Sequence, residues 1–400
     1  MPIKIKIAET AKELNDVYKL RYQVYAKEEG RFENLKGNII VDQFDTLPNA
    51  INIIAYIKDD PIGTIRINLD SAILLPADEH FDFSPYRSQV SEQLQSNNQT
   101  AVFCCASMLA ITEQWRGRRG LFRALFKLGC DVCHSWGVTH LISNVSIDTA
   151  ALYQRLQFKA LSDKIWSKAI GDHIVPMGSR IEPIYDWAFG EFKDKHDLME
   201  NFSGCFEYLV VEEGTKIFNQ GEIGHEAYLI SEGRVHLSQW DPDIKKSMVI
   251  ESLDAGSMFG ELPLIDDHPR SATAIATTKT ELIVLNRKTF WQKTNEDPHY
   301  AKGLLQILAK RLRDFGERAF NYAHADENTR LKFFINTVLS QSHESVENPG
   351  EWVAIITVEE YAHLASVSKV EASSFLLGLQ LDKRLTVTKT TLIFHDREAI

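Results

Sequence analysis

Residues 259–274 of this 400-residue chain read FGELPLIDDHPRSATA, and this is the most specific motif in the sequence. Arg270, Ser271 and the glycine at Gly260 offer one fixed guanidinium, a hydroxyl and free backbone amides, which together suit a small anion. Glu261 adds a carboxylate that can accept a hydrogen bond from a sugar hydroxyl. The stretch therefore predicts a pocket for a phosphate group with a hydroxyl-bearing group beside it.

The residues around this motif have the rhythm of a small antiparallel barrel or jelly roll. Short β-branched runs between about 203 and 287 are punctuated by glycines, which are Gly214, Gly221, Gly224, Gly233, Gly256 and Gly260. In this setting the motif resembles the phosphate-binding cassette of cyclic-nucleotide-binding domains. The resemblance implies that Arg270 and Ser271 hold the cyclic phosphate and that Glu261 takes the ribose 2′-hydroxyl. The expected nucleotide residues are Gly260, Glu261, Leu262, Arg270, Ser271, Thr273 and Phe315.

Two alternatives accompany this interpretation. Some barrels of this kind have lost their ligand, although those relatives usually lack the glutamate–arginine pair that is present here. The base is also open: Phe315 can stack on it, and cyclic AMP is preferred to cyclic GMP only because it is the commoner effector. We expect cyclic AMP as the effector.

A long helix is predicted after the barrel. Its apolar residues follow alternating steps of four and three, the seam of a two-stranded coiled coil, and they are Ala301, Leu305, Leu308, Leu312, Phe315, Ala319 and Tyr322. The helix over 300–322 therefore predicts a homodimer. The alternative is a helix that lies on its own barrel.

The tail from about 326 to 400 contains a helix–turn–helix pattern, Val358–Leu364 and Lys369–Leu381, before a predicted strand pair, Leu385–Val387 and Leu392–Phe394. It resembles the winged helix of the catabolite-activator and Fnr regulators, which implies DNA contacts at Lys369, Ser373, Lys383, Arg384 and Lys389. From residue 357 onward there are five Lys/Arg against six Asp/Glu, which is weak for gripping phosphates. DNA binding and an inherited interaction or dimerisation surface both remain open.

Residues 1–195 read as an α/β domain. An amphipathic stretch at Ala8–Glu29 predicts a helix, and a charged segment over 191–197 looks like a connector. Strands are predicted at Ile51–Ile57, Ile62–Leu69, Ala101–Ile111 and His140–Val145, and further helices from Gly120 and at Asp148–Leu156.

A glycine- and arginine-rich turn stands between one of these strands and the helix that follows. Residues 115–125 read WRGRRGLFRAL, so free amides and the positive end of a helix dipole meet there, which suits a pyrophosphate. The turn resembles that of the Gcn5-related N-acyltransferases, which holds coenzyme A, with Gly120 as the central glycine but with Gly117 and Phe122 at positions that depart from the motif. The implied cofactor residues are Arg116, Gly117, Arg118, Arg119, Gly120, Leu121 and Phe122.

Residues 148–158, DTAALYQRLQF, resemble the second motif of the same family. The resemblance places Tyr153 near the thioester sulfur, where its hydroxyl can protonate the leaving thiolate. A core tyrosine on an amphipathic helix is the alternative.

The opening of the chain resembles the acyl-homoserine-lactone synthases and the related N-acyl amino acid synthases. The similarity rests on Arg21, Asp42, Asp45 and Arg66, which in those families form an ion-pair cluster beside the acyl and amine sites. Where the lactone synthases carry E-x-S-R, this chain reads CASM over 105–108, so homoserine-lactone synthesis is not expected. The general base is open among a water relayed from Ser107, Glu113 and a histidine.

Composition narrows the function classes. A net charge of −11 offers no global attraction to nucleic acid or to an anionic membrane, and no apolar stretch approaches a membrane span. Five cysteines and an N-terminus without a signal-peptide pattern indicate a cytoplasmic protein. Cys130 and Cys133 lack a second ligand pair, so no metal is expected.

Together these patterns predict a multi-domain α+β chain. The expected parts are an acyltransferase domain at 1–195, a nucleotide-binding barrel with its long helix at 203–325 and a winged helix-turn-helix at 326–400. The expected function is transfer of an acyl group from a coenzyme A or acyl carrier protein thioester to an amine, under control of a cyclic nucleotide. The alternative is a Crp/Fnr-type transcription regulator whose acyltransferase fold is sensory or inactive. The acyl chain length and the amine acceptor stay open.

Overall fold

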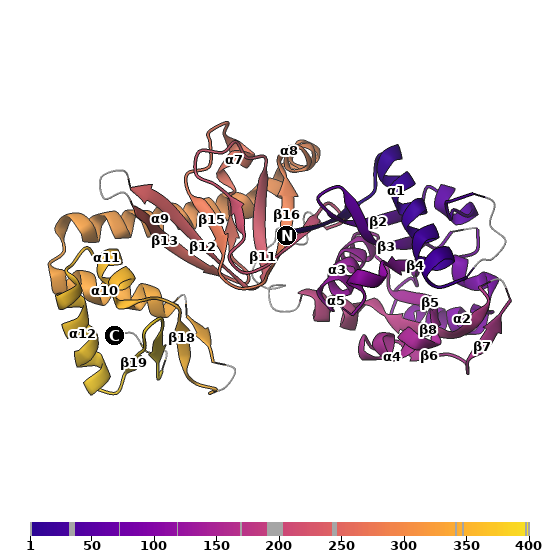
Figure 1. Ribbon diagram of the computed structural model, residues 1–400. Helices are drawn as coiled ribbons and strands as arrows, with labels where there is room; N and C mark the ends of the chain where they lie inside the picture. The colour runs from indigo at the N-terminus through magenta and orange to yellow at the C-terminus, as the bar shows by residue number, and fades with distance from the viewer. Residues whose placement is uncertain are drawn as a thin grey trace.

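The N-terminal part of the chain is a twisted sheet flanked by helices (Figure 1). The computed structural model describes residues 2–31, 37–71, 73–117, 119–168, 170–189, 203–241, 246–340, 342–345, 348–396 and 398. The strands of this part follow the spatial order β1-β2-β3-β4-β5-β8-β6, and β7 pairs with β8. Their bounds are β1 (Ile3–Ile7), β2 (Ala50–Ile57), β3 (Asp60–Leu69), β4 (Phe103–Ile111), β5 (His140–Ser146), β6 (Lys159–Ala160), β7 (Ile165–Ser167) and β8 (Asp172–Arg180).

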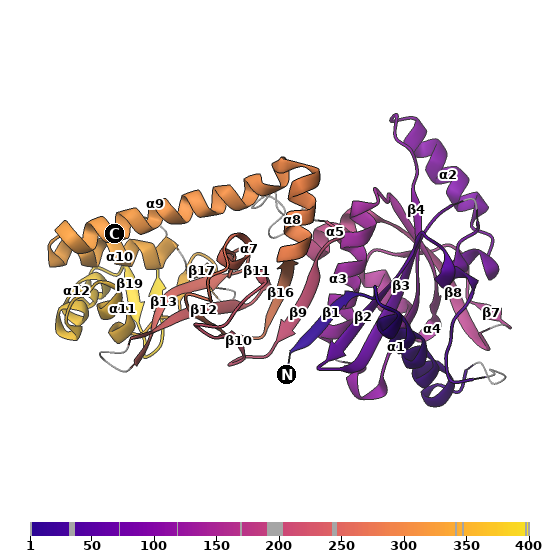
Figure 2. The same ribbon diagram turned by 90° about the horizontal axis from the view of Figure 1, so that it is seen from above.

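Helices cover both faces of this sheet. They are α1 (Ala11–Arg21), α2 (Ser84–Gln95), α3 (Arg119–Ser135), α4 (Ile147–Arg155) and α5 (Ile181–Phe189). The helix predicted from Ala8 begins later, because Ile3–Ile7 is a strand and Thr10 caps α1 by accepting from the amide of Glu13. After Arg21 the helix continues as a π-helix, Tyr22–Glu28. The predicted strands and helices at 51–69, 101–111 and 120–156 are confirmed, whereas α2, which projects from the sheet in Figure 2, had no prediction.

Two neighbouring strands of the sheet diverge. β4 pairs in parallel with β5 over Phe103–Cys105, opposite His140–Ile142. Further along β4, Met108 adopts a φ of +52°, and the register with β3 shifts at the same place. Such a bulge bends a strand and ends its regular pairing. The ends of β4 and β5 therefore separate on the side where β4 runs into the glycine-rich turn.

The middle of the chain is an antiparallel barrel. One of its sheets has the order β10-β15-β12-β13, and the other has the order β14-β11-β16-β9. The bounds are β9 (Glu207–Val211), β10 (Lys216–Phe218), β11 (Glu226–Glu232), β12 (Arg234–Asp241), β13 (Lys246–Asp254), β14 (Met258–Phe259), β15 (Thr273–Ala276) and β16 (Thr280–Asn286), with helices α7 (Leu262–Ile265) and α8 (Arg287–Glu296). Phe218, Tyr228 and Phe259 stack inside the barrel.

The barrel and the N-terminal sheet are joined edge to edge. β1 pairs with β9 through Ile3–Val210, Lys4–Leu209 and Ile5–Tyr208, so strands from both parts form a single 12-stranded sheet. Figure 2 shows β9 beside β1. The largest apolar core also crosses the junction, since Leu128 of α3 and Ile283 of β16 belong to the same cluster. The sequence did not predict this junction.

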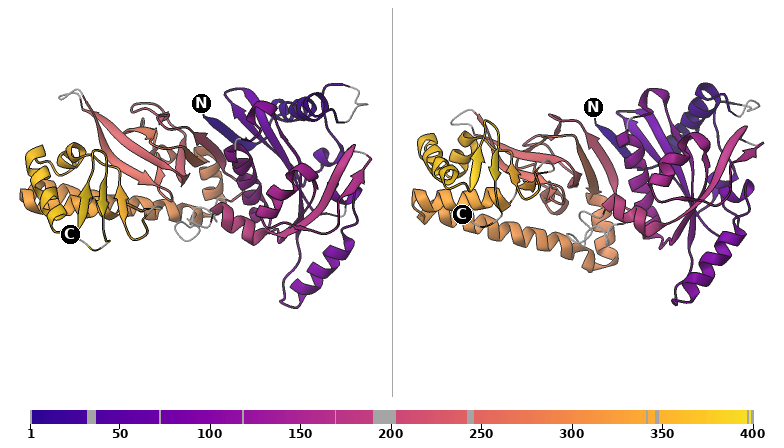
Figure 3. Two further views of the ribbon diagram at one scale, coloured as in Figure 1. Left: turned by 60° about the horizontal axis from the view of Figure 1, so that its bottom comes forward. Right: turned by 90° about the horizontal axis from the view of Figure 1, so that it is seen from below.

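A long helix connects the barrel to the C-terminal part. Figure 3 shows α9 (Lys302–His324) running along the barrel to the yellow C-terminal part of the chain. That part contains α10 (Glu327–Ser340), α11 (Val358–Leu364) and α12 (Lys369–Leu381), with a sheet of order β17-β18-β20-β19 formed by His343–Glu344, Trp352–Ala354, Leu392–Phe394 and Leu385–Val387. The helices and strands predicted in the tail are confirmed. The predicted connector at 191–197 lies outside the described residues.

Candidate functional site

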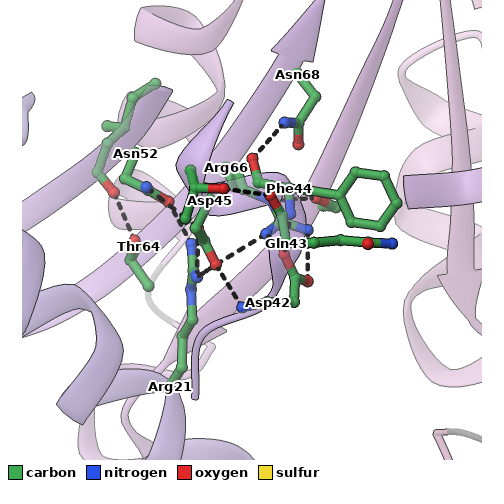
Figure 4. Close-up of polar contacts among 12 residues, drawn as sticks. Arg21, Asp42, Gln43, Phe44, Asp45, Asn52, Thr64, Arg66 and Asn68 are labelled. Atoms are coloured by element: carbon green, nitrogen blue, oxygen red, sulfur yellow. Dashed lines mark hydrogen bonds and ion pairs between the residues drawn. The ribbon is translucent and has the colours of Figure 1, made fainter. Parts of the chain in front are cut away.

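Four charged residues predicted from the sequence meet in one buried cluster (Figure 4). Nη1 of Arg21 lies 2.9 Å from Oδ1 of Asp45, and Nη1 of Arg66 lies 2.5 Å from Oδ1 of Asp42 and 3.0 Å from Oδ2 of Asp45. Burial alone would raise the pKa of Asp45, but the guanidinium groups of Arg21 and Arg66 outweigh it and lower that pKa. Asp45 is therefore ionised and is a poor proton acceptor.

Asparagines extend this cluster over one face of the sheet. Asn52 accepts from Arg21, and the side-chain amide of Asn68 donates to the carbonyl of Phe44 over 3.1 Å. The strand registers place Asn68 on the same face as Arg66, opposite α3. The side-chain oxygens of Asn68 and Asn144 are buried and have no hydrogen-bond partner among the described residues. These two oxygens can therefore accept hydrogen bonds from a ligand on this face.

Sequence reasoning missed these asparagines. A polar residue that interrupts an apolar strand, as in Ile51-Asn52-Ile53 and Ile67-Asn68-Leu69, was the available signal. An amide in a buried strand needs hydrogen-bond partners, so such an interruption marks a polar network.

The glycine-rich turn over 116–122, which we call the phosphate turn, follows β4 and a short 3₁₀ helix, Glu113–Trp115. Gly117 has a φ of +77°, which favours glycine, and α3 starts at Arg119 with Gly120, Leu121 and Phe122 in its first turn. Arg116 is tied by ion pairs to Glu28 at 2.7 Å and Glu29 at 3.1 Å. Arg118 lies outside the described residues, as does the side chain of Arg119. The first turn of α3 contains no acidic residue, so its free amides and helix dipole stay available to an anion.

Tyr153 lies on α4 and is packed edge-on against Phe122, Phe126 and Phe158. Burial raises the pKa of its hydroxyl. The side chain is therefore neutral and keeps a proton to donate.

The two predicted candidates for the base lie in different surroundings. Ser107 is on β4, and its hydroxyl accepts from Nε of Arg66 over 3.2 Å. Glu113 is exposed in a short 3₁₀ turn, Glu113–Trp115, beyond the end of β4. Ser107 thus belongs to the polar cluster, while Glu113 borders the phosphate turn.

The cysteines of β4 and α3 are core residues. Cys105 is buried in β4, and burial raises the pKa of its thiol to about 12. The sulfur atoms of Cys104 and Cys133 lie 3.7 Å apart, and burial also raises the pKa of the Cys104 thiol. None of these thiols is set up as a nucleophile.

The nucleotide motif forms a second polar centre in the barrel. Arg270 is buried, donates to the carbonyl of Gly260 over 2.7 Å and lies 4.2 Å from the ring centre of Phe218. A side chain at Gly224 or Gly260 would collide with it, since an added Cβ would lie 2.3 Å or 2.7 Å from its guanidinium. Glu261 is also buried. Arg270 and Glu261 thus place a positive and a negative charge in the same buried region of the barrel.

This centre fits a polar ligand. Nε of Arg270 and Oε2 of Glu261 are buried, and no hydrogen-bond partner for either atom lies in the part of the chain that the structure describes. Burial lowers the pKa of Arg270, and its ion pair with Glu226 is long, with 3.7 Å between the nitrogen and the oxygen. A cyclic phosphate beside Arg270 and a ribose hydroxyl beside Glu261 would satisfy both atoms.

The remaining predicted nucleotide residues surround these two. Ser271 is exposed at the start of β15, Leu262 is half exposed at the start of α7, and the hydroxyl of Thr273 accepts from the amide of Gln220 over 3.0 Å. Phe315 is 69% exposed on α9. One turn earlier, Arg311 donates to Glu261 over 2.5 Å and to the carbonyl of Met258 over 2.6 Å, a contact that the sequence did not reveal.

The candidate DNA residues lie on the C-terminal part. Lys369 begins α12, 3.5 Å from the carboxylate of Glu359, and the exposed side of that helix carries Val370, Leu377 and Leu381. Ser373 is exposed on the same helix, and Lys383, Arg384 and Lys389 flank β19. The exposed face of α12 is therefore apolar more than basic.

Two negative findings apply to the described residues. They contain no group of three or more His, Cys, Asp or Glu side chains that could hold a metal ion. None of their helices is long and apolar enough to cross a membrane.

Comparison with known families assigns the two centres. Residues 16–180 match the model of the N-acyl amino acid synthase FeeM, and residues 208–297 match the cyclic nucleotide-binding domain. The first match contains the polar cluster, the phosphate turn and Tyr153. The second contains Glu261 and Arg270. Residues 16–180 are thus similar to an N-acyl amino acid synthase, and residues 208–297 are similar to a cyclic nucleotide-binding domain.

Individual relatives resemble the second domain. The cyclic AMP receptor protein of Thermus thermophilus is 34% identical over 109 residues, which are 27% of this chain and 50% of that protein. The CRP-like cAMP-activated global transcriptional regulator of Mycobacterium tuberculosis is 30% identical over 100 residues, 25% of this chain and 44% of the relative. The chain thus spans about half the length of these relatives.

Two solved structures are similar to about half of the chain. The catabolite activator protein of Thermus thermophilus is 26% identical with a TM-score of 0.29, covering 48% of this chain and 86% of that chain. The c-di-GMP responsive regulator CLP of Xanthomonas campestris is 22% identical with a TM-score of 0.40, covering 50% of this chain and 98% of that chain.

Proposed function

We propose that the protein is an N-acyltransferase whose activity is set by a cyclic nucleotide. The observation that carries this proposal is the course of β4. At Ser107 the strand touches the polar cluster, it diverges from β5 beyond Cys105, and it then leads into the phosphate turn. An acyl thioester bound at the turn would thus reach the polar face through the gap between the two strands.

The reaction is an acyl substitution. The nitrogen of a free amine attacks the thioester carbon, the carbon–sulfur bond breaks, and the amide and a free thiol are formed. Backbone amides of β4 beyond Cys105, which have left the β5 ladder, are suited to stabilise the oxyanion. Tyr153 protonates the departing thiolate, and a water held by Ser107, or Glu113, takes the proton from the amine.

The amine is proposed to be that of an amino acid. The unpartnered oxygens of Asn68 and Asn144 can accept its N–H groups, on the face that also carries the arginine–aspartate cluster. The matched synthase domain supports this acceptor class. The donor is an acyl group on phosphorylated pantetheine, either coenzyme A or an acyl carrier protein.

The regulatory proposal rests on the barrel. Cyclic AMP is the proposed effector, bound by Arg270, Ser271 and Glu261, with Phe315 available to stack on the base in a dimer formed along α9. The exposed apolar residues of α9 support that dimer. The C-terminal part is proposed as a winged helix-turn-helix, and its apolar α12 face favours an interaction surface over a DNA reader.

The decisive experiment measures release of free thiol. Acyl-coenzyme A and acyl carrier protein thioesters of short and long chains are offered with a pool of amino acids, with and without cyclic AMP. Release that depends on the acceptor and responds to the nucleotide is expected. Silence under all conditions, with folded protein, would instead favour a regulator with a sensory acyltransferase fold, and DNA-binding selection would follow.

A matched pair of variants tests the assignment of Tyr153. Tyr153→Phe should lower kcat about 100-fold because the leaving thiolate loses its acid, and should change KM little. Tyr56→Phe is the control. Tyr56 is a buried tyrosine whose hydroxyl donates a hydrogen bond to the carboxylate of Asp16 on α1. Equal activity of the two variants would contradict the role of Tyr153.

A further inference from the structure

The barrel places a lysine on the phosphate turn of the synthase domain. The Nζ atom of Lys279, in the turn between β15 and β16, lies 2.8 Å from the position that a Cβ on Gly120 would occupy, and its Cε lies 3.6 Å from it. Glycine at this position leaves room for the end of the exposed lysine side chain. No ion pair joins the ammonium of Lys279 to a carboxylate in the described ranges.

The ammonium of Lys279 and the start of α3 are both suited to contact the same anion. Gly120 lies in the first turn of α3, where the helix dipole is positive and no acidic residue stands. Of the neighbouring arginines whose side chains the structure describes, Arg116 pairs with Glu28, and Arg123 pairs with Glu232 of the barrel. The exposed ammonium of Lys279 thus lies beside the positive end of α3, and no carboxylate of the described ranges forms an ion pair with it.

The turn that carries Lys279 is held firmly. The hydroxyl of Thr278 accepts from the amide of Arg234 over 3.0 Å, and the amide of Thr277 donates to the carbonyl of Arg234 over 2.9 Å. Gly233 packs against the same turn, where an added Cβ would lie 2.5 Å from the carbonyl oxygen of Lys279. The backbone of Lys279 is therefore preorganised, although its side chain is exposed.

β15 connects the turn of Lys279 to the polar centre around Arg270 and Glu261, which we call the nucleotide centre. Arg270 and Ser271 stand directly before β15 (Thr273–Ala276), and Lys279 stands in the turn after it. Glu281, at the beginning of β16, pairs with Lys127 of α3 at 2.9 Å. One short segment thus contacts the nucleotide centre at one end and the phosphate-binding helix at the other.

We propose that Lys279 is a donor-binding residue that the cyclic nucleotide-binding domain supplies to the acyltransferase site. Its ammonium contacts a phosphate oxygen of the phosphorylated pantetheine donor beside Gly120, in the first turn of α3. Because β15 links Arg270 and Ser271 to the turn of Lys279, the nucleotide acts through this segment on the KM of the donor and leaves kcat unchanged. This inference rests on the proposed acyltransferase function.

The test uses the full chain and three donors that differ only in their carrier. These are an acyl-coenzyme A, the same acyl group on an acyl carrier protein, and the same acyl group on pantetheine without phosphate. Lys279→Ala should raise the KM for coenzyme A about 5- to 20-fold, because a charged hydrogen bond at an exposed site is lost. The KM for the pantetheine thioester should not change. The carrier-protein arm tells whether the single phosphate of that donor uses the same lysine.

Lys288→Ala is the matched control, since Lys288 is an exposed lysine of the barrel on α8. It should leave all three KM values unchanged. In Lys279→Ala the cyclic AMP effect on the coenzyme A KM should disappear, while the nucleotide Kd measured by calorimetry stays at the wild-type value.

Each other outcome overturns a defined statement. A coenzyme A KM unchanged by Lys279→Ala in an active enzyme overturns the inference and leaves the proposed function intact. An equal rise for phosphate-free pantetheine shows a structural effect and also overturns it. If the wild type transfers from no thioester, calorimetry with coenzyme A decides: equal Kd values for wild type and Lys279→Ala overturn the inference, and no binding to either overturns both proposals.

Discussion

Among single residues, Arg270 is the one whose surroundings most clearly await a ligand. Its guanidinium lies over the rings of Phe218 and Tyr228, and its Nε has no partner. A guanidinium that is buried without a close carboxylate gains more from an incoming phosphate than an exposed one, because it has already lost its water. The protein thus bears the cost of desolvation before the nucleotide arrives.

We therefore expect Arg270→Ala to weaken cyclic nucleotide binding by about 100-fold, since charged hydrogen bonds to the phosphate are lost. The thermal midpoint without nucleotide should shift little, whereas the rise that cyclic AMP causes in the wild type should vanish. Calorimetry and thermal unfolding check both statements. A variant with unchanged Kd would show that the barrel motif is misread.

Asp131 of α3 gives a prediction of pH dependence. Burial raises the pKa of its carboxyl to about 7, although the amide of Gly204 and the hydroxyl of Ser203 donate to it over 2.8 Å and 2.9 Å. The folded protein then holds a proton that the unfolded chain releases near pH 4, so the free energy of unfolding falls as pH rises from about 4 to 7.

Asp131→Asn removes the titrating carboxyl group and with it this contribution to the pH dependence of the free energy of unfolding. Urea unfolding between pH 4 and pH 8 should show that the difference between the variant and the wild type changes in favour of the variant up to about pH 7 and is constant above it. Parallel stability curves for the two proteins over the whole range would contradict the raised pKa.

Among the secondary-structure elements, α9 has the clearest unpartnered surface. Leu305, Leu312 and Phe315 are exposed in the single chain, and they lie on the predicted coiled-coil seam. Exposed apolar residues in a row on one helix favour association with a second copy. The helix also carries Arg311, which contacts Glu261, so a dimer along α9 would set the nucleotide centre beside the partner.

A charge on this seam should therefore abolish the dimer. Leu312→Glu is expected to give a monomer by size-exclusion chromatography with light scattering, because two buried carboxylates would face each other. Arg313→Ala, an exposed change on the same helix away from the seam, is the control and should remain dimeric. A wild type that is already monomeric would refute the predicted dimer.

For the whole molecule, the junction between the N-terminal sheet and the barrel contains buried polar contacts like those inside a domain. Lys127 of α3 is buried and reaches both Glu281, at 2.9 Å, and the hydroxyl of Ser231, at 3.1 Å. A buried ion pair whose partner is removed leaves an uncompensated charge, which costs about 3–5 kcal/mol. The two domains are thus coupled and should unfold together.

Calorimetric unfolding of two variants tests this coupling. Lys127→Met should separate one cooperative transition into two or lower its midpoint strongly, whereas the double variant with Glu281→Leu should recover much of the loss because no charge stays unpaired. Lys4→Met is the control. Its ion pair with Glu207 lies at the exposed rim of the same junction and should be worth less than about 1 kcal/mol. Equal effects of Lys127→Met and Lys4→Met would show that the junction is loose.

Patterns with short range were readable from the sequence. The barrel motif, the glycine turns, the helices of the tail and the seam of α9 all follow from periodicity and turn chemistry within a few residues. The arginines and aspartates of the N-terminal cluster were found only through resemblance, because a charge by itself is compatible with an exposed surface. Asn68, Asn144, Arg311 and Lys279 were not found, since each acquires its role from a residue far away in the chain.

The sequence by itself determined which elements form and which side chains hold chemistry, because propensity, capping and hydrophobic period act between neighbours. Only the tertiary structure decided that β1 and β9 join two domains into one sheet, that Arg270 and Glu261 are buried with free polar atoms, and that Lys279 reaches Gly120. The physical reason is that edge-strand pairing and long side-chain contacts are set by the packing of whole faces. Such packing leaves no local pattern in the residues that take part.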